Sequence, residues 1–200
     1  MNVSRETSEM LARYAGLVRQ WSPKINLVAA SQLDQLEDRH IADCLQLTKL
    51  ISPGATTITD LGSGGGFPGV ILAIDASADH PGRTVTLIES DQRKGVFLRT
   101  VIRELNLPAK VISARIDAAD VAPADVVTAR ALAPLPQLLT YSARLLRKDG
   151  VAIFPKGETV TTELEDARSQ WSFACQEVAS ETRTNARILV IKDIQRGTAF

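Results

Sequence analysis

The sequence has 200 residues, of which 44% are hydrophobic and 23% charged. This composition predicts one soluble globular domain with a sizeable core and excludes two full domains. The formal net charge is zero, which excludes a protein coated in positive charge for nucleic acid. No run of about 18 apolar residues is present, so the sequence also excludes a membrane-spanning helix.

The two cysteines, Cys44 and Cys175, lie far apart in the sequence. They offer neither a disulfide framework nor the spacing of a metal site. The first residues are polar and lack the apolar core of a signal peptide. We therefore expect a cytoplasmic protein with core-filling thiols, no bound metal and no membrane association.

The chain is predicted to begin with two helices. Over 6–21, apolar side chains recur at steps of three and four residues, which is typical of an amphipathic helix. Pro23 is expected to end this helix. A second helix is predicted over 31–51, where Ser31 and Asp34 have the spacing of a capping box. The pattern therefore indicates a helical extension at the start of the chain.

The pattern changes after this extension, which covers residues 1–55, and residues 56–200 alternate strands with helices. The predicted strands lie at 57–62, 84–90, 109–116, 124–131, 151–157, 174–183 and 187–194, and the predicted helices at 69–76, 93–106, 135–150 and 161–171. The last two strands are close enough in sequence to be antiparallel neighbours. This alternation predicts an α/β fold with a doubly wound, mostly parallel, seven-stranded sheet.

Two of these helices carry more detailed expectations. The helix over 93–106 is expected to turn Val96, Phe97, Val101 and Leu105 inward. The helix over 135–150 is expected to end at its terminal glycine.

The segment TDLGSGGGFPGV, residues 59–70, holds five glycines between a predicted strand and a predicted helix. In open α/β sheets, ligands bind at the carboxyl ends of the strands. Gly62, Gly64 and Gly66 would let the backbone approach such a ligand closely. The spacing also satisfies a dinucleotide-binding fingerprint, with Glu89 about 20 residues further on. The loop spacing alone leaves the ligand open.

Two features favour a ligand without phosphate. Asp60 precedes the first glycine, and we expect its carboxylate to face the pocket, where it would repel a pyrophosphate and suit a cation. Phe67 and Pro68 occupy the stretch where a dinucleotide site needs a bare helix N-terminus. An acid, a glycine loop and then Glu89 at the end of the next strand resemble the class I S-adenosylmethionine (SAM) methyltransferases, whose cofactor carries an amino group and a sulfonium.

The resemblance extends to one family. The segments that carry it are INLVA at 25–29, RHIADCL at 39–45, DLGSGGGFPG at 60–69, IES at 88–90, TARA at 128–131 and PKG at 155–157. Their order and spacing resemble the RsmG (GidB) family, the bacterial 16S rRNA guanine-N7 methyltransferases. The resemblance covers nearly the whole chain and implies a class I methyltransferase fold.

The resemblance also implies roles for individual residues. The implied cofactor contacts are Asp60, Gly62, Gly64, Gly66, Phe67, Glu89, Ile116, Asp117 and Arg130. Asp117 is shorter than the family's usual Glu, and Glu89 is longer than its more frequent Asp. Arg130 is the implied catalytic residue, placed where cofactor and base should meet. The implied RNA phosphate contacts are Arg93, Lys94, Arg115 and Lys156.

Other candidate catalytic groups are set aside. His40 lies among apolar neighbours, and we interpret it as a structural histidine paired with Asp43 or Asp38 rather than as a base. The segment ARALAPL, after the fourth predicted strand, lacks both the Asp/Asn-Pro-Pro-aromatic segment of exocyclic-amine methyltransferases and a nucleophilic cysteine. A ring nitrogen with a free lone pair is the acceptor that needs least from the protein.

The resemblance therefore implies methyl transfer from SAM to N7 of a guanine in 16S rRNA, near the decoding site, and the acceptor chemistry of a ring nitrogen agrees with it. The expected partner is 16S rRNA or a small ribosomal subunit precursor, and the expected oligomeric state is a monomer. A small-molecule SAM methyltransferase, with the helical extension as a lid, is the alternative. A catalytically inactive SAM-binding module is a third possibility.

Overall fold

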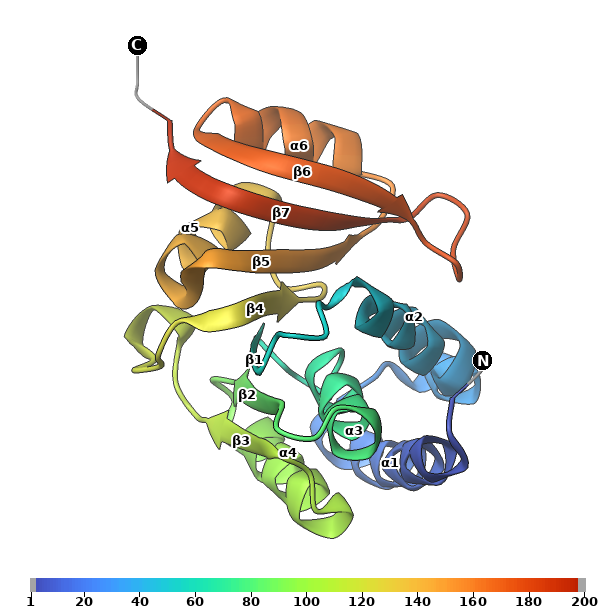
Figure 1. Ribbon diagram of the computed structural model, residues 1–200. Helices are drawn as coiled ribbons and strands as arrows, with labels where there is room; N and C mark the ends of the chain where they lie inside the picture. Colours follow the sequence, from blue (N-terminus) through green and yellow to red (C-terminus); the bar gives the residue numbers. More distant parts are fainter. Residues whose placement is uncertain (1–2, 198–200) are drawn as a thin grey trace.

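A computed structural model describes residues 3–197 and shows a seven-stranded sheet between helices (Figure 1). The strands are β1 (Thr57–Leu61), β2 (Thr84–Ile88), β3 (Ala109–Ile112), β4 (Ala124–Ala129), β5 (Leu146–Lys156), β6 (Trp171–Ala179) and β7 (Arg187–Arg196). The α-helices are α1 (Arg5–Ile25), α2 (Ala42–Leu45), α3 (Gly69–Asp79), α4 (Gln92–Leu105), α5 (Leu135–Leu145) and α6 (Val160–Arg168). Four short helical segments of other types are η1 (Ala30–Gln35), η2 (Glu37–Ile41), η3 (Gln46–Leu50) and η4 (Ile116–Ala118).

The strands lie in the order β3-β2-β1-β4-β5-β7-β6. Strands β1 to β5 run parallel, and β7 runs antiparallel to both β5 and β6. The predicted doubly wound, mostly parallel, seven-stranded sheet is therefore confirmed, including its antiparallel final pair. The strand order reverses between β1 and β4, and ligands of such sheets bind at that switch point, beside the carboxyl ends of the strands.

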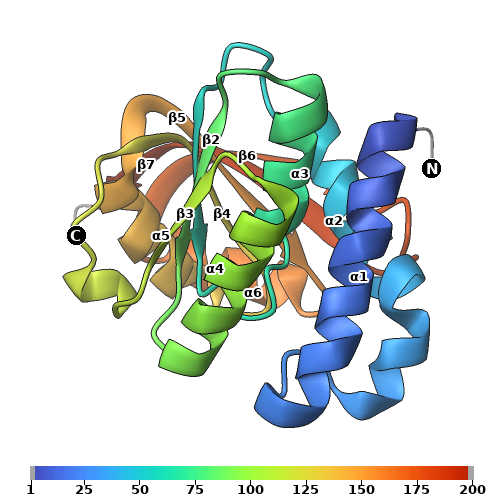
Figure 2. The ribbon, with the colours of Figure 1, turned by 90° about the horizontal axis from the view of Figure 1, so that it is seen from below.

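Two apolar cores hold the helices against the sheet. One packs α1, α3 and α4 on one face, and the other packs α5 and α6 on the opposite face. Figure 2 shows α1 alongside α3, outside the layer that α3 and α4 form. Leu11 and Val18 of α1 belong to the same core as Ile58 of β1 and Phe97 of α4. The helical extension and the sheet are thus joined by a shared core.

The first helix is longer than expected. Pro23 lies inside α1, which continues to Ile25 and ends at Asn26 in the left-handed conformation (φ 51°). The expectation that Pro23 ends the helix is wrong, but the helix continues for only two residues beyond it. The lost N–H and the steric effect of the proline ring therefore fall on the last turn, where few intrahelical bonds depend on them. The N–H of Asn26 closes the last turn on the carbonyl of Ser22 at 2.9 Å.

The region 31–51 is helical, but it is not the single α-helix that its apolar pattern predicts. It consists of η1, a π-helical turn in η2, the short helix α2 and η3. No side-chain hydrogen bond caps η1, so the predicted Ser31 capping box is wrong. The wide turn of η2 buries Ile41 and Cys44 in the core while the Asp43 side chain reaches a pocket on the other side.

Two further details differ from expectation. Val96 is 47% exposed, while Phe97, Val101 and Leu105 are buried as predicted. Val96 lies one residue off the buried stripe of α4 and faces outward. Helix α5 ends at Leu145 rather than at Gly150, because β5 begins directly at Leu146. Residues 146–150 pair irregularly with β4 before the regular ladder begins.

Candidate functional site

The glycine loop connects β1 to α3 at the switch point of the sheet. Gly62, Gly64 and Gly66 have positive φ values of 62°, 55° and 97°, a region that other residues rarely adopt. A Cβ at Gly66 would lie 2.5 Å from Val70 Cγ2 and 2.9 Å from the Tyr14 hydroxyl. Both the backbone conformation and the packing therefore require glycine at position 66.

The helical extension holds this loop in place. The Tyr14 hydroxyl of α1 donates a 2.5 Å hydrogen bond to the carbonyl of Gly65. Burial raises the pKa of Tyr14 well above its ordinary value, so its proton stays available for this bond. Phe67 packs against the Tyr14 ring at 5.5 Å and against the His40 ring at 5.3 Å between centroids. The extension thus forms one wall of the loop.

Asp60 lies beneath the loop and is fully buried. Its Oδ2 accepts the N–H of Gly69, the first residue of α3, at 3.2 Å, while its Oδ1 has no hydrogen-bond partner. Burial raises the pKa of Asp60 to about 7. The expectation that this carboxylate faces an open pocket is wrong. Because a carboxylate already occupies the start of α3, the loop is a poor site for a pyrophosphate.

Glu89 lies at the end of β2 and reaches across to the loop. One carboxylate oxygen accepts the N–H of Gly64 at 2.8 Å, and the other accepts the N–H of Asp91 at 2.7 Å. The side chain is largely buried. Glu89 therefore fixes the loop from the neighbouring strand, as its predicted place requires, and each of its oxygens keeps acceptor capacity for another donor.

A pocket of about 150 Å³ opens beside the loop. It is lined by Gly62, Ile88, Ser90, Ala114, Arg115, Ile116, Asp117, Leu132 and Tyr141. The structure thus brings three of the predicted cofactor contacts, Gly62, Ile116 and Asp117, to one wall. The sequence analysis missed Ser90 and Tyr141. Ser90 could have been found, since it directly follows Glu89 at a strand end.

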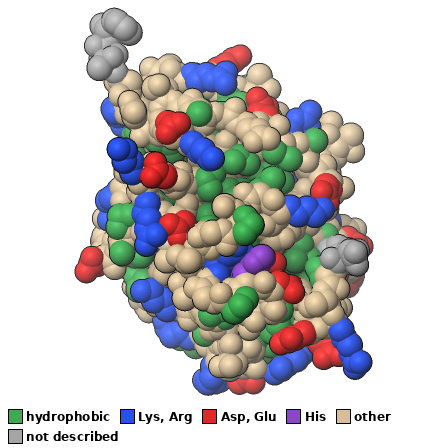
Figure 3. Space-filling model, in the orientation of Figure 1, with side chains coloured by type: hydrophobic (Ala, Val, Ile, Leu, Met, Phe, Trp, Pro, Cys, Tyr) green, Lys and Arg blue, Asp and Glu red, His purple; other side chains and the backbone are tan. Residues whose placement is uncertain are grey.

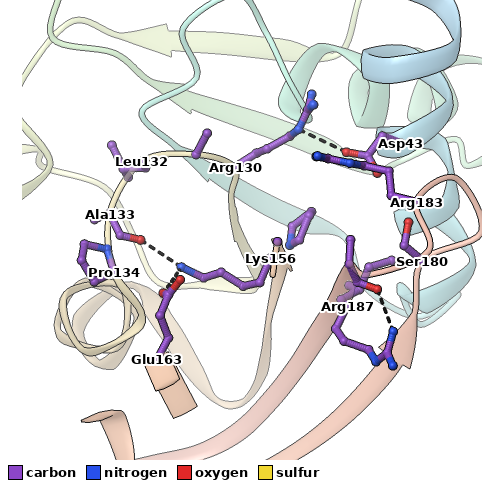
Figure 4. A pocket seen from close by; sticks show the side chains of 15 residues that line it. Asp43, Arg130, Leu132, Ala133, Pro134, Lys156, Glu163, Ser180, Arg183 and Arg187 are labelled. Atoms are coloured by element: carbon purple, nitrogen blue, oxygen red, sulfur yellow. Dashed lines mark hydrogen bonds and ion pairs between the residues drawn. The ribbon is translucent and has the colours of Figure 1, made fainter. Parts of the chain in front are cut away.

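A larger pocket of about 380 Å³ lies at the ends of β4 and β5, next to the turn between β6 and β7 (Figure 4). It is lined by Asp43, Arg130, Ala131, Leu132, Ala133, Pro134, Pro155, Lys156, Gly157, Glu163, Ser180, Arg183, Ala186, Arg187 and Ile188. Leu132 lines both pockets, and a Cβ on Gly62 would lie 2.5 Å from its Cδ1. Leu132 therefore stands between the two pockets.

Arg130 follows β4 and lines the larger pocket but not the smaller one. Its Nε lies 3.3 Å from Asp43 Oδ2, its Nη1 lies 3.1 Å from His40 Nδ1, and its Nη2 donates to the Arg39 carbonyl at 3.2 Å. Only 15% of the side chain is exposed. The extension thus uses several of the five guanidinium donors and fixes the orientation of the rest.

His40 is hydrogen-bonded on both ring nitrogens. Its Nε2 lies 3.1 Å from Gln32 Oε1, and its Nδ1 faces Arg130. Because Arg130 can only donate, Nδ1 accepts and Nε2 carries the proton. Burial and the charges of Arg130 and Arg39 lower the pKa of His40 to about 4. The expected partners Asp43 and Asp38 are wrong, but the geometry agrees with a structural histidine, since neither nitrogen is free to take a proton.

The predicted phosphate contacts are dispersed. Lys156 pairs with Glu163 at 2.7 Å and donates to the Ala133 carbonyl at 3.0 Å, so most of its charge is already compensated. Arg115 is exposed and lies 3.3 Å from Asp117 at the rim of the smaller pocket. Arg93 and Lys94 start α4, outside both pockets.

Two cations of the larger pocket were missed by the sequence analysis. Within residues 3–197, Arg183 and Arg187 form no ion pair. Figure 3 shows basic and acidic side chains interspersed over one face rather than a continuous basic surface. The charged side chains that line this pocket are nevertheless mostly positive, with Arg130, Lys156, Arg183 and Arg187 against Asp43 and Glu163.

Two classes of feature are not found in the part of the chain that the structure describes. No helix there is long and apolar enough to cross a membrane. No group of three or more His, Cys, Asp or Glu side chains among residues 3–197 could hold a metal ion.

Comparisons of the sequence with known proteins identify the family of the chain. Residues 7–190 match the family model GidB, described as rRNA small subunit methyltransferase G. The chain is 50% identical over 194 residues to "Ribosomal RNA small subunit methyltransferase G" of Gluconobacter oxydans, covering 97% of each chain. It is 49% identical to the protein of the same name from Paracoccus denitrificans, covering 98% of this chain and 99% of the relative.

Solved structures show the same fold at low identity. A TehB-like SAM-dependent methyltransferase from Corynebacterium glutamicum superposes with a TM-score of 0.60 at 16% identity, covering 91% of this chain and 98% of that one. A Pyrococcus abyssi tRNA (uracil-54, C5)-methyltransferase in complex with S-adenosyl-L-homocysteine gives a TM-score of 0.53 at 19% identity, covering 76% and 37%. The predicted class I methyltransferase fold is therefore confirmed.

Proposed function

The chain belongs to the rRNA small subunit methyltransferase G family, and on that premise we propose that it methylates N7 of a guanine in 16S rRNA, near the decoding site, with SAM as methyl donor. One observation about the candidate site supports this proposal most directly. A pocket at the glycine loop and a pocket with excess positive charge adjoin, with Leu132 between them. A methyl donor and an RNA base need adjoining sites of this kind.

The residues of the smaller pocket and the glycine loop fit SAM. The cofactor supplies a methyl group on a positively charged sulfonium. Asp60 faces no open pocket, but it lies below the loop and its Oδ1 has no hydrogen-bond partner. When ionised, its negative charge acts through space and favours a cationic ligand over a pyrophosphate. Glu89 is placed to accept hydrogen bonds from ribose hydroxyls, and Ile116 and Asp117 to flank the adenine.

The larger pocket would hold the acceptor base. Guanine N7 carries an in-plane lone pair that is unprotonated near neutral pH, so no general base is needed. Arg130 would orient the base through its remaining donors, which suit the O6 carbonyl better than a lysine would. The protein then has to hold the reacting atoms about 3–3.5 Å apart and in line.

The RNA contacts and the assembly state remain predictions. Arg93 and Arg115 are exposed and Lys94 is half-buried, so all three are candidates to contact phosphates. Arg183 and Arg187 add charge at the larger pocket. With zero net charge overall, few phosphates would be neutralised and the dependence of affinity on salt would be shallow. We further propose a monomer that acts in the cytoplasm, where its rRNA substrate is found.

The proposed function is tested by methyl transfer from labelled SAM. Purified protein is incubated with 16S rRNA, with small-subunit precursors and with mature subunits, and the labelled base is mapped by nuclease digestion and mass spectrometry. We expect one N7-methylguanine in 16S rRNA. Label on another nucleotide would contradict the proposed acceptor. Transfer only to small molecules of a cell extract would instead support the small-molecule alternative.

Replacing Glu89 by alanine should weaken SAM binding by about 1.5–3 kcal/mol, the usual range for a hydrogen bond to a charged group. The change removes the ribose acceptor and frees the N–H of Gly64. Isothermal titration calorimetry measures the affinity. Glu89→Gln is the matched control, since it keeps one acceptor oxygen and should lose less. If wild type and Glu89→Ala bound SAM with equal affinity, Glu89 would not be a cofactor contact.

At saturating SAM, the single-turnover rate should stay nearly flat between about pH 6.5 and pH 9. The pKa of His40 is about 4, so this side chain stays neutral throughout the range, and the proposed reaction requires no other base. Quenched-flow assays with 16S rRNA give the profile. A rate that rises steeply through this range in wild type, and no longer does so in His40→Ala, would show that His40 is a base after all.

A further inference from the structure

Asp43 lies where three segments that are distant in the sequence meet. Its side chain is only 6% exposed, and its Oδ2 lies 3.3 Å from Arg130 Nε. Its Oδ1 accepts the hydroxyl of Thr182 at 2.8 Å and the amide of Gln46 at 3.0 Å. One buried carboxylate therefore joins the helical extension, the end of β4 and the turn between β6 and β7.

The turn between β6 and β7 depends on the extension for its position. The Gln46 side chain accepts the N–H of Glu181 at 2.8 Å and donates to the Ser180 hydroxyl at 3.2 Å. An exposed ion pair of 2.7 Å joins Lys49 to Glu181, and exposed pairs contribute little. The part-buried bonds of Asp43 and Gln46 are therefore the main ties that hold this turn against the extension.

The same turn carries Arg183 to the larger pocket. Figure 4 shows Arg130 and Arg183 next to Asp43. Both arginines line the pocket, and the positive charges of both act on His40. Like charges at such a site repel each other. The carboxylate of Asp43 offsets this repulsion and lets both guanidinium groups remain on one side of the pocket.

We propose that Asp43 is the positioning residue of the acceptor-base pocket: one carboxylate oxygen sets Arg130, and the other sets the turn that carries Arg183. Asp43 would not touch the substrate, and it acts through the two groups that it holds. The inference rests on the proposed function, because positioning is judged by the rate of rRNA methylation.

Asp43→Asn tests this inference because an amide has only one oxygen. The NH₂ group of asparagine can only donate hydrogen bonds. Whichever way the amide is turned, either Arg130 Nε or the donors of Thr182 and Gln46 lose their acceptor. We expect kcat for 16S rRNA to fall by roughly 10- to 100-fold, as when a reacting group is misplaced by about an ångström. The KM for SAM should stay within about twofold.

Asp75→Asn is the matched control. Asp75 is also a buried carboxylate paired with a buried arginine, at 3.2 Å from Arg83, but it lines neither pocket. Both variants should lower the melting temperature, and only Asp43→Asn should lower kcat. An unchanged kcat in Asp43→Asn, or an equal loss of kcat in Asp75→Asn, would overturn the inference.

Two other variants separate the two halves of the proposal and remain informative if Asp43→Asn folds poorly. Asp43→Glu keeps the charge and should recover part of the lost kcat. Thr182→Val removes the bond between Asp43 and the turn but keeps two bonds of Gln46 to it, so it should raise the KM for rRNA more than it lowers kcat. The inference would be overturned if Asp43→Glu had the same low kcat as Asp43→Asn and Thr182→Val had the kinetics of the wild type.

These outcomes are distinct from failure of the proposed function. If wild-type protein methylates no guanine N7 in 16S rRNA, the proposed function fails before any variant is compared. If wild type is active on that base and Asp43→Asn matches it, only the positioning role fails.

Discussion

Replacing Arg130 by alanine should lower kcat for rRNA methylation by roughly 100-fold or more, the loss that follows removal of a preorganised donor from a reacting group. SAM affinity should change little, because Arg130 lines the larger pocket and not the smaller one. The variant also leaves Asp43 buried without its cation, which should cost about 3–5 kcal/mol of folding stability. Steady-state kinetics and calorimetry separate these effects.

Arg83→Ala is the control for this loss of stability. Arg83 is buried, pairs with Asp75 at 3.2 Å and donates to the carbonyls of Ala55 and Ser52. Its removal takes the guanidinium partner from a buried carboxylate, as the removal of Arg130 does, although His80 Nε2 still lies 3.5 Å from Asp75 Oδ2. Arg83 and Asp75 line neither pocket. Both variants should be destabilised, and only Arg130→Ala should lose kcat. A comparable loss in Arg83→Ala would assign the effect to stability.

Asp60→Asn should stabilise the cofactor-free protein by up to about 4 kcal/mol at pH 8 and by less than half as much at pH 5. The folded pKa of about 7 lies above the ordinary value of 3.8, so the folded state binds the proton more tightly than the unfolded state. Wild-type stability therefore falls as the pH rises from about 4 to about 7. Denaturant unfolding at the two pH values measures the difference.

The same variant should bind SAM more weakly, since it loses the negative charge below the loop. Wild-type affinity should rise with pH through about 7, as Asp60 ionises, and Asp60→Asn should lose this dependence. A cofactor affinity independent of pH in both proteins would show that Asp60 shapes the loop without attracting the cofactor. A less stable Asp60→Asn at pH 8 would contradict the raised pKa.

The sheet could be predicted because its strands are short apolar runs separated by helices with a distinct period. The same reasoning failed over 31–51, where a π-helical turn replaces regular α-helix. In this segment Ile41 packs in the core and Asp43 lines the pocket. The regular spacing of apolar residues predicts only the buried face of a helix, so it does not reveal the second set of contacts. The predicted end of the first helix at Pro23 was wrong for a simpler reason, because α1 tolerates a proline this close to its end.

The candidate site was predictable where its residues are neighbours in sequence. Gly62 and Glu89 follow directly from two adjacent strand ends. The bond between Arg130 and Asp43 joins residues 87 positions apart, and no local pattern indicates it. Arg183 and Arg187 reach the pocket only because β7 returns beside β5, and the pairing of Lys156 with Glu163 likewise depends on how α6 packs.

The insertion of β7 between β5 and β6 determines the order in which the sheet can close during synthesis. Strand β6 is made before β7, yet among residues 3–197 its backbone pairs as a strand only with β7. Until residues 187–196 have left the ribosome, the edge of β5 stays open and β6 has no partner, which makes both prone to association with other chains. The larger pocket is completed at the same moment, because Arg187 begins β7 and lines this pocket. Formation of the larger pocket is therefore coupled to the last step of sheet assembly.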